Sequence, residues 1–148
     1  MKQKFAFYRH NGKGSLEIFF RPSQILQTLI DSGEAYVSDD FPPIDLEFID
    51  AFHYNPENKE FTCDHTSIQE MAKMLLSEKR KQALENLDAE QIKYLGNPEK
   101  LARIESLKQN LRDLPSTIDF TTINSPNDAR HLRPPILETY LEDINDPA

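Results

Sequence analysis

The segment Cys63-Asp64-His65 is the part of this sequence that comes closest to a metal-binding pattern. A thiolate and an imidazole are zinc ligands, and alternate residues of a strand point to one face. A zinc site needs three or four ligands, however. The other histidines are scattered along the chain, at His10, His53 and His131. We therefore expect no metal site here, but a half-buried cysteine at a strand end, followed by a helix-capping Asp or Thr.

Carboxylates are the second group of residues whose chemistry could matter. Paired acids catalyse proton transfer when burial separates their pKa values. Between residues 31 and 50 there are seven acids and no Lys or Arg, and they include Asp39, Asp40, Asp45, Glu47 and Asp50. Acids without basic neighbours in a Pro-containing polar stretch are typical of a solvated loop. No nucleophile motif or phosphate-binding glycine loop occurs either, so we predict a protein that is not an enzyme and needs no cofactor.

The charge of the chain indicates what kind of partner it has. The formal net charge is −8 over 148 residues, and this surface would repel a phosphate backbone. A basic patch on another protein is a better partner than nucleic acid. No apolar run approaches the roughly 18 residues that span a membrane, so no membrane partner is expected. The N-terminus lacks an apolar signal region and Cys63 is the single cysteine, which together favour an intracellular, reducing environment.

Three regions must position these residues, and the first, residues 1–63, is predicted to be a small antiparallel α+β domain. Apolar and polar residues alternate on both sides of the turn at residues 11–14, whose Asn and Gly favour a β-hairpin. The predicted elements are strands 4–9 and 16–20, a short helix opened by residue 22 or 23 and ended by Gly33, a strand at 35–37, and strands 47–54 and 59–63.

The second region, residues 64–115, is predicted to be an α-helical hairpin, because the apolar period changes from 2 toward 3.6. One helix is expected from Thr66 to Leu87, then a short helix over residues 88–95, then a third helix capped by Asn97. The third helix has a narrow apolar seam at Leu101, Ile104, Leu107, Leu111 and Leu114. This seam suits packing on the first helix, and the alternative is that part of it receives a partner.

The third region, residues 116–148, is predicted to be an extended Pro-rich segment that ends in a short amphipathic helix. Helices of about ten residues are marginal alone in water, so this one must dock. We expect it to dock on a partner chain or on a second copy of this one. Docking on the protein's own body is the alternative. The candidate partner-binding residues of the chain are Leu107, Leu111, Leu114, Ile136, Tyr140, Leu141 and Ile144.

The segment from Leu107 to Pro115, L-K-Q-N-L-R-D-L-P, followed by Ile118-Asp119-Phe120, resembles a segment of the tail and tail-fibre assembly chaperones of tailed bacteriophages. In that family a helix commonly ends in Y-R-Q-A-L-R-D-L-P and is followed by an extended, Pro-containing tail. A looser likeness covers residues 54–120. The chain departs from the pattern at Leu107, where the family has an aromatic residue. It also lacks the Trp-Pro near the end and has a longer C-terminal segment.

The resemblance implies a non-enzymatic chaperone that binds a phage tail or tail-fibre subunit in the host cytoplasm during assembly. The alternative is a structural adaptor of the virion, such as a baseplate or fibre-attachment component, which would lie in the virion tail. A homo-oligomer is compatible with both interpretations. A third hypothesis, from a different class, is a small enzyme whose site is invisible in one sequence.

Overall fold

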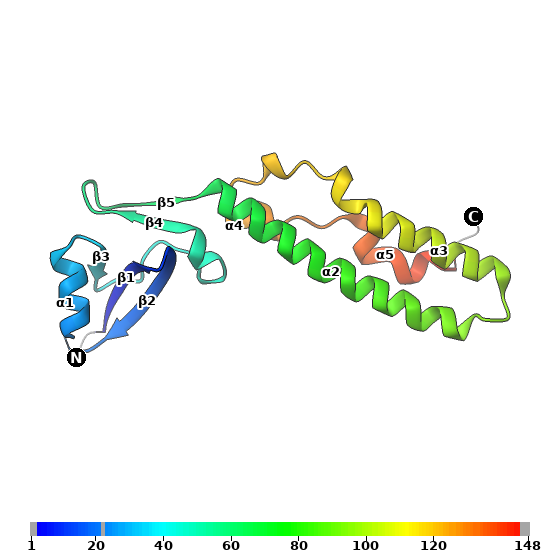
Figure 1. The fold of residues 1–148 in the computed structure, drawn as a ribbon, viewed down its shortest axis with the longest axis horizontal. Helices are drawn as coiled ribbons and strands as arrows, with labels where there is room; N and C mark the ends of the chain where they lie inside the picture. Colours follow the sequence, from blue (N-terminus) through cyan, green and yellow to red (C-terminus); the bar gives the residue numbers. More distant parts are fainter. Residues whose placement is uncertain (1–2, 22, 146–148) are drawn as a thin grey trace. The chain divides into compact units, whose positions relative to one another are not determined.

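The computed structural model describes residues 3–21 and 23–145 of the chain. The chain divides into two compact units, residues 1–68 and residues 69–148. Antiparallel strands dominate the first part of the sequence and helices the second, as the element order in Figure 1 shows. The predicted α+β class, with a small N-terminal β-sheet followed by helices, is therefore confirmed.

The first unit is built on a three-stranded antiparallel sheet with the strand order β2-β1-β3. Its strands are β1 (Lys4–His10), β2 (Lys13–Phe19) and β3 (Ala35–Ser38). β1 and β2 form the predicted hairpin, and Asn11 and Gly12 have positive φ angles in its turn, a conformation that Asn and Gly accept. β3 is the third strand expected from the sequence, and it pairs with the other edge of β1.

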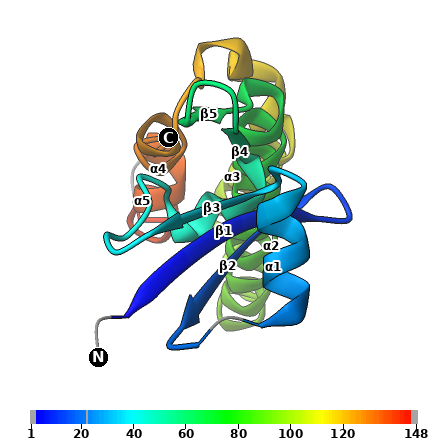
Figure 2. The ribbon, with the colours of Figure 1, turned by 90° about the vertical axis from the view of Figure 1, so that its left-hand side faces the viewer.

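A helix and a second hairpin complete the first unit. Helix α1 (Gln24–Asp31) begins where the side chain of Ser23 accepts a hydrogen bond from the Leu26 amide at 3.1 Å. Figure 2 shows α1 beside the three-stranded sheet. The second hairpin consists of β4 (Phe52–Asn55) and β5 (Glu60–Cys63).

The first strand of this second hairpin is shorter than predicted. The strand expected over residues 47–54 begins instead with a 3-10 helix, η1 (Leu46–Ala51). The side chain of Asp45 accepts a hydrogen bond from the Glu47 amide at 3.2 Å. A short side chain that binds the backbone two residues ahead favours a turn over an extended chain, which explains the difference.

Aromatic side chains connect the two sheets of the first unit. Phe7 of β1 is fully buried and meets Phe61 of β5 edge to face, with ring centroids 5.2 Å apart. Tyr36 of β3 packs on the same Phe61 ring at 4.9 Å and on Tyr54 of β4 at 5.0 Å. Such pairs stabilise a core beyond the area they bury. One cluster of rings therefore joins strands from both sheets.

Gly14 permits the close approach of β2 to η1. A Cβ atom at this position would lie within 3.0 Å of the Ile49 carbonyl oxygen and 3.1 Å from Cζ of Phe7. We expect Gly14→Ala to destabilise the protein by about 1–3 kcal/mol, because the backbone carbonyl must move. Gly96→Ala is the control, since nothing lies within 4 Å of that position. Urea unfolding followed by circular dichroism measures both, and equal effects of the two substitutions would contradict the steric explanation.

Helices form the second unit. The long helix α2 (His65–Lys93) is followed by α3 (Pro98–Asp113), and Asn97 caps α3 as predicted, accepting a hydrogen bond from the Lys100 amide at 3.2 Å. The sequence predicted a break after Leu87, but α2 continues unbroken through this position. The carboxylate of Asp88, where the short helix was predicted to begin, instead pairs with a lysine of α3.

The segment after α3 is more structured than predicted. Residues 116–135 were expected to be extended, but the structure contains η2 (Leu114–Thr117), η3 (Phe120–Thr122) and α4 (Pro126–Arg130). Ser125 caps α4 by accepting a hydrogen bond from the Asp128 amide at 3.1 Å, and proline occupies the first helical position. Ser followed by Pro is a sequence signal for a helix start, so α4 was detectable. The predicted C-terminal helix is α5 (Pro135–Asp143).

Candidate functional site

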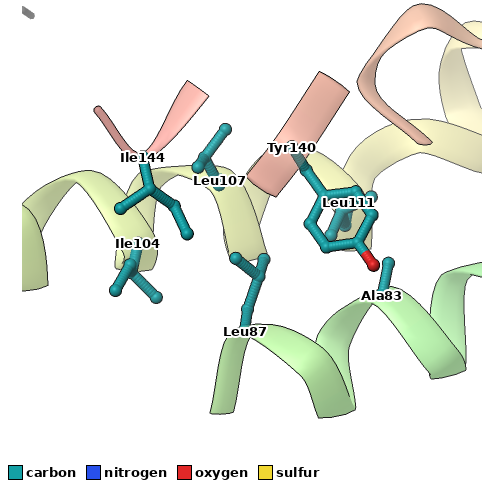
Figure 3. Close-up of a cluster of buried hydrophobic side chains, with 7 residues drawn as sticks. All are labelled: Ala83, Leu87, Ile104, Leu107, Leu111, Tyr140 and Ile144. Carbon is teal, nitrogen blue, oxygen red and sulfur yellow. The ribbon is translucent and has the colours of Figure 1, made fainter. Parts of the chain in front are cut away.

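The predicted seam residues of α3 lie inside the second unit. Leu107, Leu111 and Leu114 are buried, as the spacing of the seam predicted. Leu107 and Leu111 belong to a core cluster that includes Ala83 and Leu87 of α2, and Figure 3 shows these side chains facing one another. The structure therefore shows the seam packed against the first helix of the hairpin, which is the first of the two roles that the sequence indicated. A role of these residues in partner binding stays a prediction.

The C-terminal helix α5 docks on the chain's own helices. Tyr140 and Ile144 are buried in the same cluster (Figure 3). Ile136 is half-buried and packs against this cluster. This is the arrangement that the sequence analysis held as the alternative to docking on a partner. Its physical basis is the apolar groove between α2 and α3, which a third amphipathic helix fills. Leu141 is the member of the predicted set whose side chain is most exposed, at 46%.

Polar contacts also fix α5 on its neighbours. The side-chain amide of Asn86 on α2 donates a hydrogen bond to the Tyr140 hydroxyl oxygen at 2.7 Å. Nε of Arg103 on α3 donates to the Asp143 carbonyl oxygen at 3.0 Å, and Nζ of Lys100 donates to Asn145 at 2.9 Å. Cations near the C-terminus of a helix are favoured by its dipole. The sequence did not reveal these contacts, because they join residues about 40 to 54 positions apart.

The segment Cys63-Asp64-His65 forms a helix start. The carboxylate of Asp64 accepts hydrogen bonds from the Thr66 amide at 3.2 Å and the Ser67 hydroxyl at 2.7 Å. Burial raises the pKa of the Cys63 thiol, and the charge of Asp64 raises it further, so the thiol is protonated at neutral pH. Over residues 3–21 and 23–145, no three His, Cys, Asp or Glu side chains are placed to hold a metal ion.

His53 is the histidine whose protonation is linked to the fold. Its Nε2 lies 2.8 Å from Nη2 of Arg9, and a guanidinium only donates, so the imidazole must be neutral. Partial burial lowers the pKa of His53 below 6.5, the positive charge of Arg9 lowers it further, and Asp64 opposes them. Below the unfolded pKa of 6.5 the unfolded chain therefore binds more protons than the folded one, and protein stability falls.

We expect the free energy of unfolding to decrease as the pH falls through about 6.5 toward the lower folded pKa of His53. The variant His53→Gln retains an acceptor for Arg9 but does not titrate, so its stability should change less over this range. Urea unfolding between about pH 8 and pH 5 compares the two proteins. If the free energy of unfolding depends on pH in the same way for both proteins, the pKa of His53 is the same in the folded and unfolded states, and the prediction is wrong.

Lys108 is a buried charge that sequence analysis missed. Its side chain is 7% exposed, its Nζ forms an ion pair with Asp88 of α2, and it donates to Oε1 of Gln91 at 2.6 Å. The lysine occupies a position beside the seam of α3, where an exposed residue was expected from its type. Its partners lie on another helix, so the sequence spacing held no signal for this pair.

Removing the anion of this pair should cost more stability than replacing the buried cation with an apolar side chain. We expect Asp88→Ala to destabilise the protein by about 1–2 kcal/mol, less than for a fully buried pair because the Asp88 side chain is 64% exposed. Lys108→Met keeps the packing without a charge and should change stability by under about 1 kcal/mol. Glu85→Ala, an exposed acid on the same helix, is the control in urea unfolding. A larger loss for Lys108→Met than for Asp88→Ala would reverse the interpretation.

A surface groove lies beside the end of α3. It has a volume of about 470 Å³ and is lined on α2 by Lys73, Leu76, Ser77 and Arg80, and on the segment after α3 by Pro115, Ser116 and Phe120. Nη1 of Arg80 donates to the carbonyl oxygens of Leu111 and Arg112 at the end of α3. The groove thus adjoins the segment that resembles the phage chaperones.

No protein-family model, curated protein or solved structure matches this chain. Among the described residues, no helix is both long and apolar enough to cross a membrane.

Proposed function

We propose that this protein is a non-enzymatic assembly factor that binds a tail or tail-fibre subunit of a tailed bacteriophage. The proposal is carried by the resemblance of Leu107 to Pro115 to the helix end of the tail assembly chaperones. It is supported by the position of that segment, because α3 ends at Asp113 and the turn η2 follows at once. The segment is thus a helix end in this chain, as it is in the family.

Each unit has exposed apolar side chains that such a factor could use for contact with its client. Tail and fibre subunits expose apolar surface before assembly, and a chaperone covers it. The large apolar side chains that are at least half exposed in the second unit are Met74, Ile92 and Leu95, and those in the first unit are Ile18, Phe20, Ile25 and Leu46. Apolar groups exposed to this degree are available for contact with another protein.

The C-terminal departure from the family pattern favours a second candidate function. Residues 121–148 replace the family's short tail, and they contain α4 and α5. A structural adaptor of the virion, in the baseplate or at the fibre attachment, would need a stable body of this kind. The adaptor and the chaperone differ in one observable property, which is whether the protein remains in the finished particle.

The test uses an affinity-tagged full chain, produced during infection of the host. Complexes are purified from infected cells that are collected before the phage lyses them. Finished particles are purified on a gradient. Both samples are analysed by mass spectrometry. We expect a tail or tail-fibre subunit in the complexes and none of the tagged chain in the particles. Its presence in particles at the copy number of a virion component would favour the adaptor. Failure to recover any tail or fibre subunit with the tagged chain would contradict both functions.

A further inference from the structure

The groove of the second unit combines apolar side chains with two cations. Leu76 and Phe120 give it apolar surface, whereas Lys73 and Arg80 bring positive charge, and no acid lines it. This composition is unusual for a chain with a net charge of −8. Positive charge beside apolar surface fits a ligand that offers an anion next to an apolar group.

Arg80 is held in place with part of its hydrogen-bonding capacity unused. Its Nη1 donates to the carbonyl oxygens of Leu111 at 3.4 Å and Arg112 at 3.2 Å, in the last turn of α3. Its Nε is buried without a hydrogen-bond partner among the described residues. A buried donor without a partner is uncommon, and here it belongs to a side chain that lines the groove and brings positive charge to it.

Lys73 supplies the second charge. Its Nζ lies 5.5 Å from the centre of the Phe120 ring and 3.5 Å from a carboxylate oxygen of Glu70. The side chains of Lys73 and Glu70 are both more than half exposed, and exposed ion pairs of this kind are weak. The ammonium is therefore available to a ligand that enters beside Phe120.

We propose that this groove binds an acidic segment of a protein partner, with a carboxylate on Arg80 and Lys73 and a neighbouring apolar side chain on Phe120 and Leu76. Two cations are too few to follow a phosphate backbone, and the rest of the chain is acidic, so a nucleic acid is disfavoured. A wholly apolar segment would leave the charges of Arg80 and Lys73 without an anion in the groove. The inference deepens the proposed function, because it names the chemistry by which the client would be recognised.

The first experiment is independent of any client. The ¹⁵N-labelled full chain is titrated with the acetylated peptide Asp-Glu-Phe-Leu-Asp and with its amide analogue Asn-Gln-Phe-Leu-Asn, both to millimolar concentration. We expect the acidic peptide to shift the amide signals of Ser77, Arg80 and Ser116, and the amide analogue to bind at least about fivefold more weakly. The proposal would be overturned by equal binding of the two peptides, by shifts confined to other surfaces, or by no binding. A parallel titration with a single-stranded oligonucleotide that binds more strongly than the acidic peptide would also overturn it.

The second experiment uses charge-reversal variants on the same helix. Lys73→Glu places an acid in the groove, whereas Lys79→Glu makes the same change at an exposed position outside its lining. We expect Lys73→Glu to weaken the acidic peptide about tenfold and Lys79→Glu less than twofold, because one lies at the ligand and the other is screened. Equal losses in the two variants would mean that the net charge, and not this groove, attracts the peptide.

The same two variants separate this inference from the proposed function. In the infection experiment, Lys73→Glu should recover less tail or fibre subunit than Lys79→Glu. If both variants recover the subunit equally, the groove proposal is wrong and the assembly function stands. If the unmodified chain recovers no subunit but binds the acidic peptide in the groove, the assembly function is wrong and the groove proposal stands.

Discussion

Phe7→Ala will destabilise the protein by about 3–5 kcal/mol, the usual cost of removing a buried aromatic side chain. Phe7 is fully buried on the central strand β1 and meets the ring of Phe61 at 5.2 Å. Its loss removes apolar burial and leaves a cavity among the rings that connect the two sheets of the first unit. Urea unfolding followed by circular dichroism measures the change in free energy.

Phe20→Ala is the matched control for this experiment, because the Phe20 side chain is 57% exposed. We expect it to change stability by under about 0.5 kcal/mol, as surface substitutions commonly do. A similar loss for both phenylalanines would mean that the ring cluster is not the core of the first unit. Amide hydrogen exchange locates the effect, and protection should fall first in β1 and β5.

Leu111→Ala will destabilise the protein by about 2–5 kcal/mol. Leu111 is fully buried in the cluster that joins α2, α3 and α5, as Figure 3 shows. The spread of the expected value reflects how far the neighbouring side chains can collapse into the cavity. Urea unfolding again measures the free energy, and amide exchange in α3 reports where protection is lost.

Leu95→Ala controls for the loss of a leucine in the same unit, because the Leu95 side chain is 72% exposed. It should change stability by under about 0.5 kcal/mol. If Leu111→Ala costs no more than this control, the seam of α3 does not pack inside the unit. That result would return Leu111 to the partner-binding role for which the sequence analysis considered it.

Local patterns predicted the elements that depend on local interactions. The alternation of β1 and β2 around an Asn-Gly turn, the capping of α3 by Asn97, and the burial of Leu107 and Leu111 are all in the structure. In each case the signal is a pattern of residues within one turn or on one face of a single element. The spacing of residue types along the sequence therefore suffices to predict these strands, this cap and this buried face.

The features that sequence analysis missed depend on contacts between elements. Asp88 has the spacing of a helix cap, but its ion pair with Lys108 lies within an unbroken α2. Arg80 donates to carbonyl oxygens more than 30 residues away, a contact that no pattern on its own helix indicates. The candidate groove could not be predicted for the same reason, because its two walls meet only when α3 packs on α2.

The docking of α5 has a consequence for the order in which the chain folds during synthesis. Tyr140 and Ile144 are translated after α2 and α3, yet they complete the cluster around Leu87 and Leu107. Domains fold from the N-terminus as the ribosome releases them, so the first unit can form early. The helical unit, in contrast, must keep part of α2 and α3 uncovered until α5 has been translated. During that interval, α5 of a neighbouring nascent chain could occupy the open position, so any dimer of this chain would be expected to form by exchange of α5.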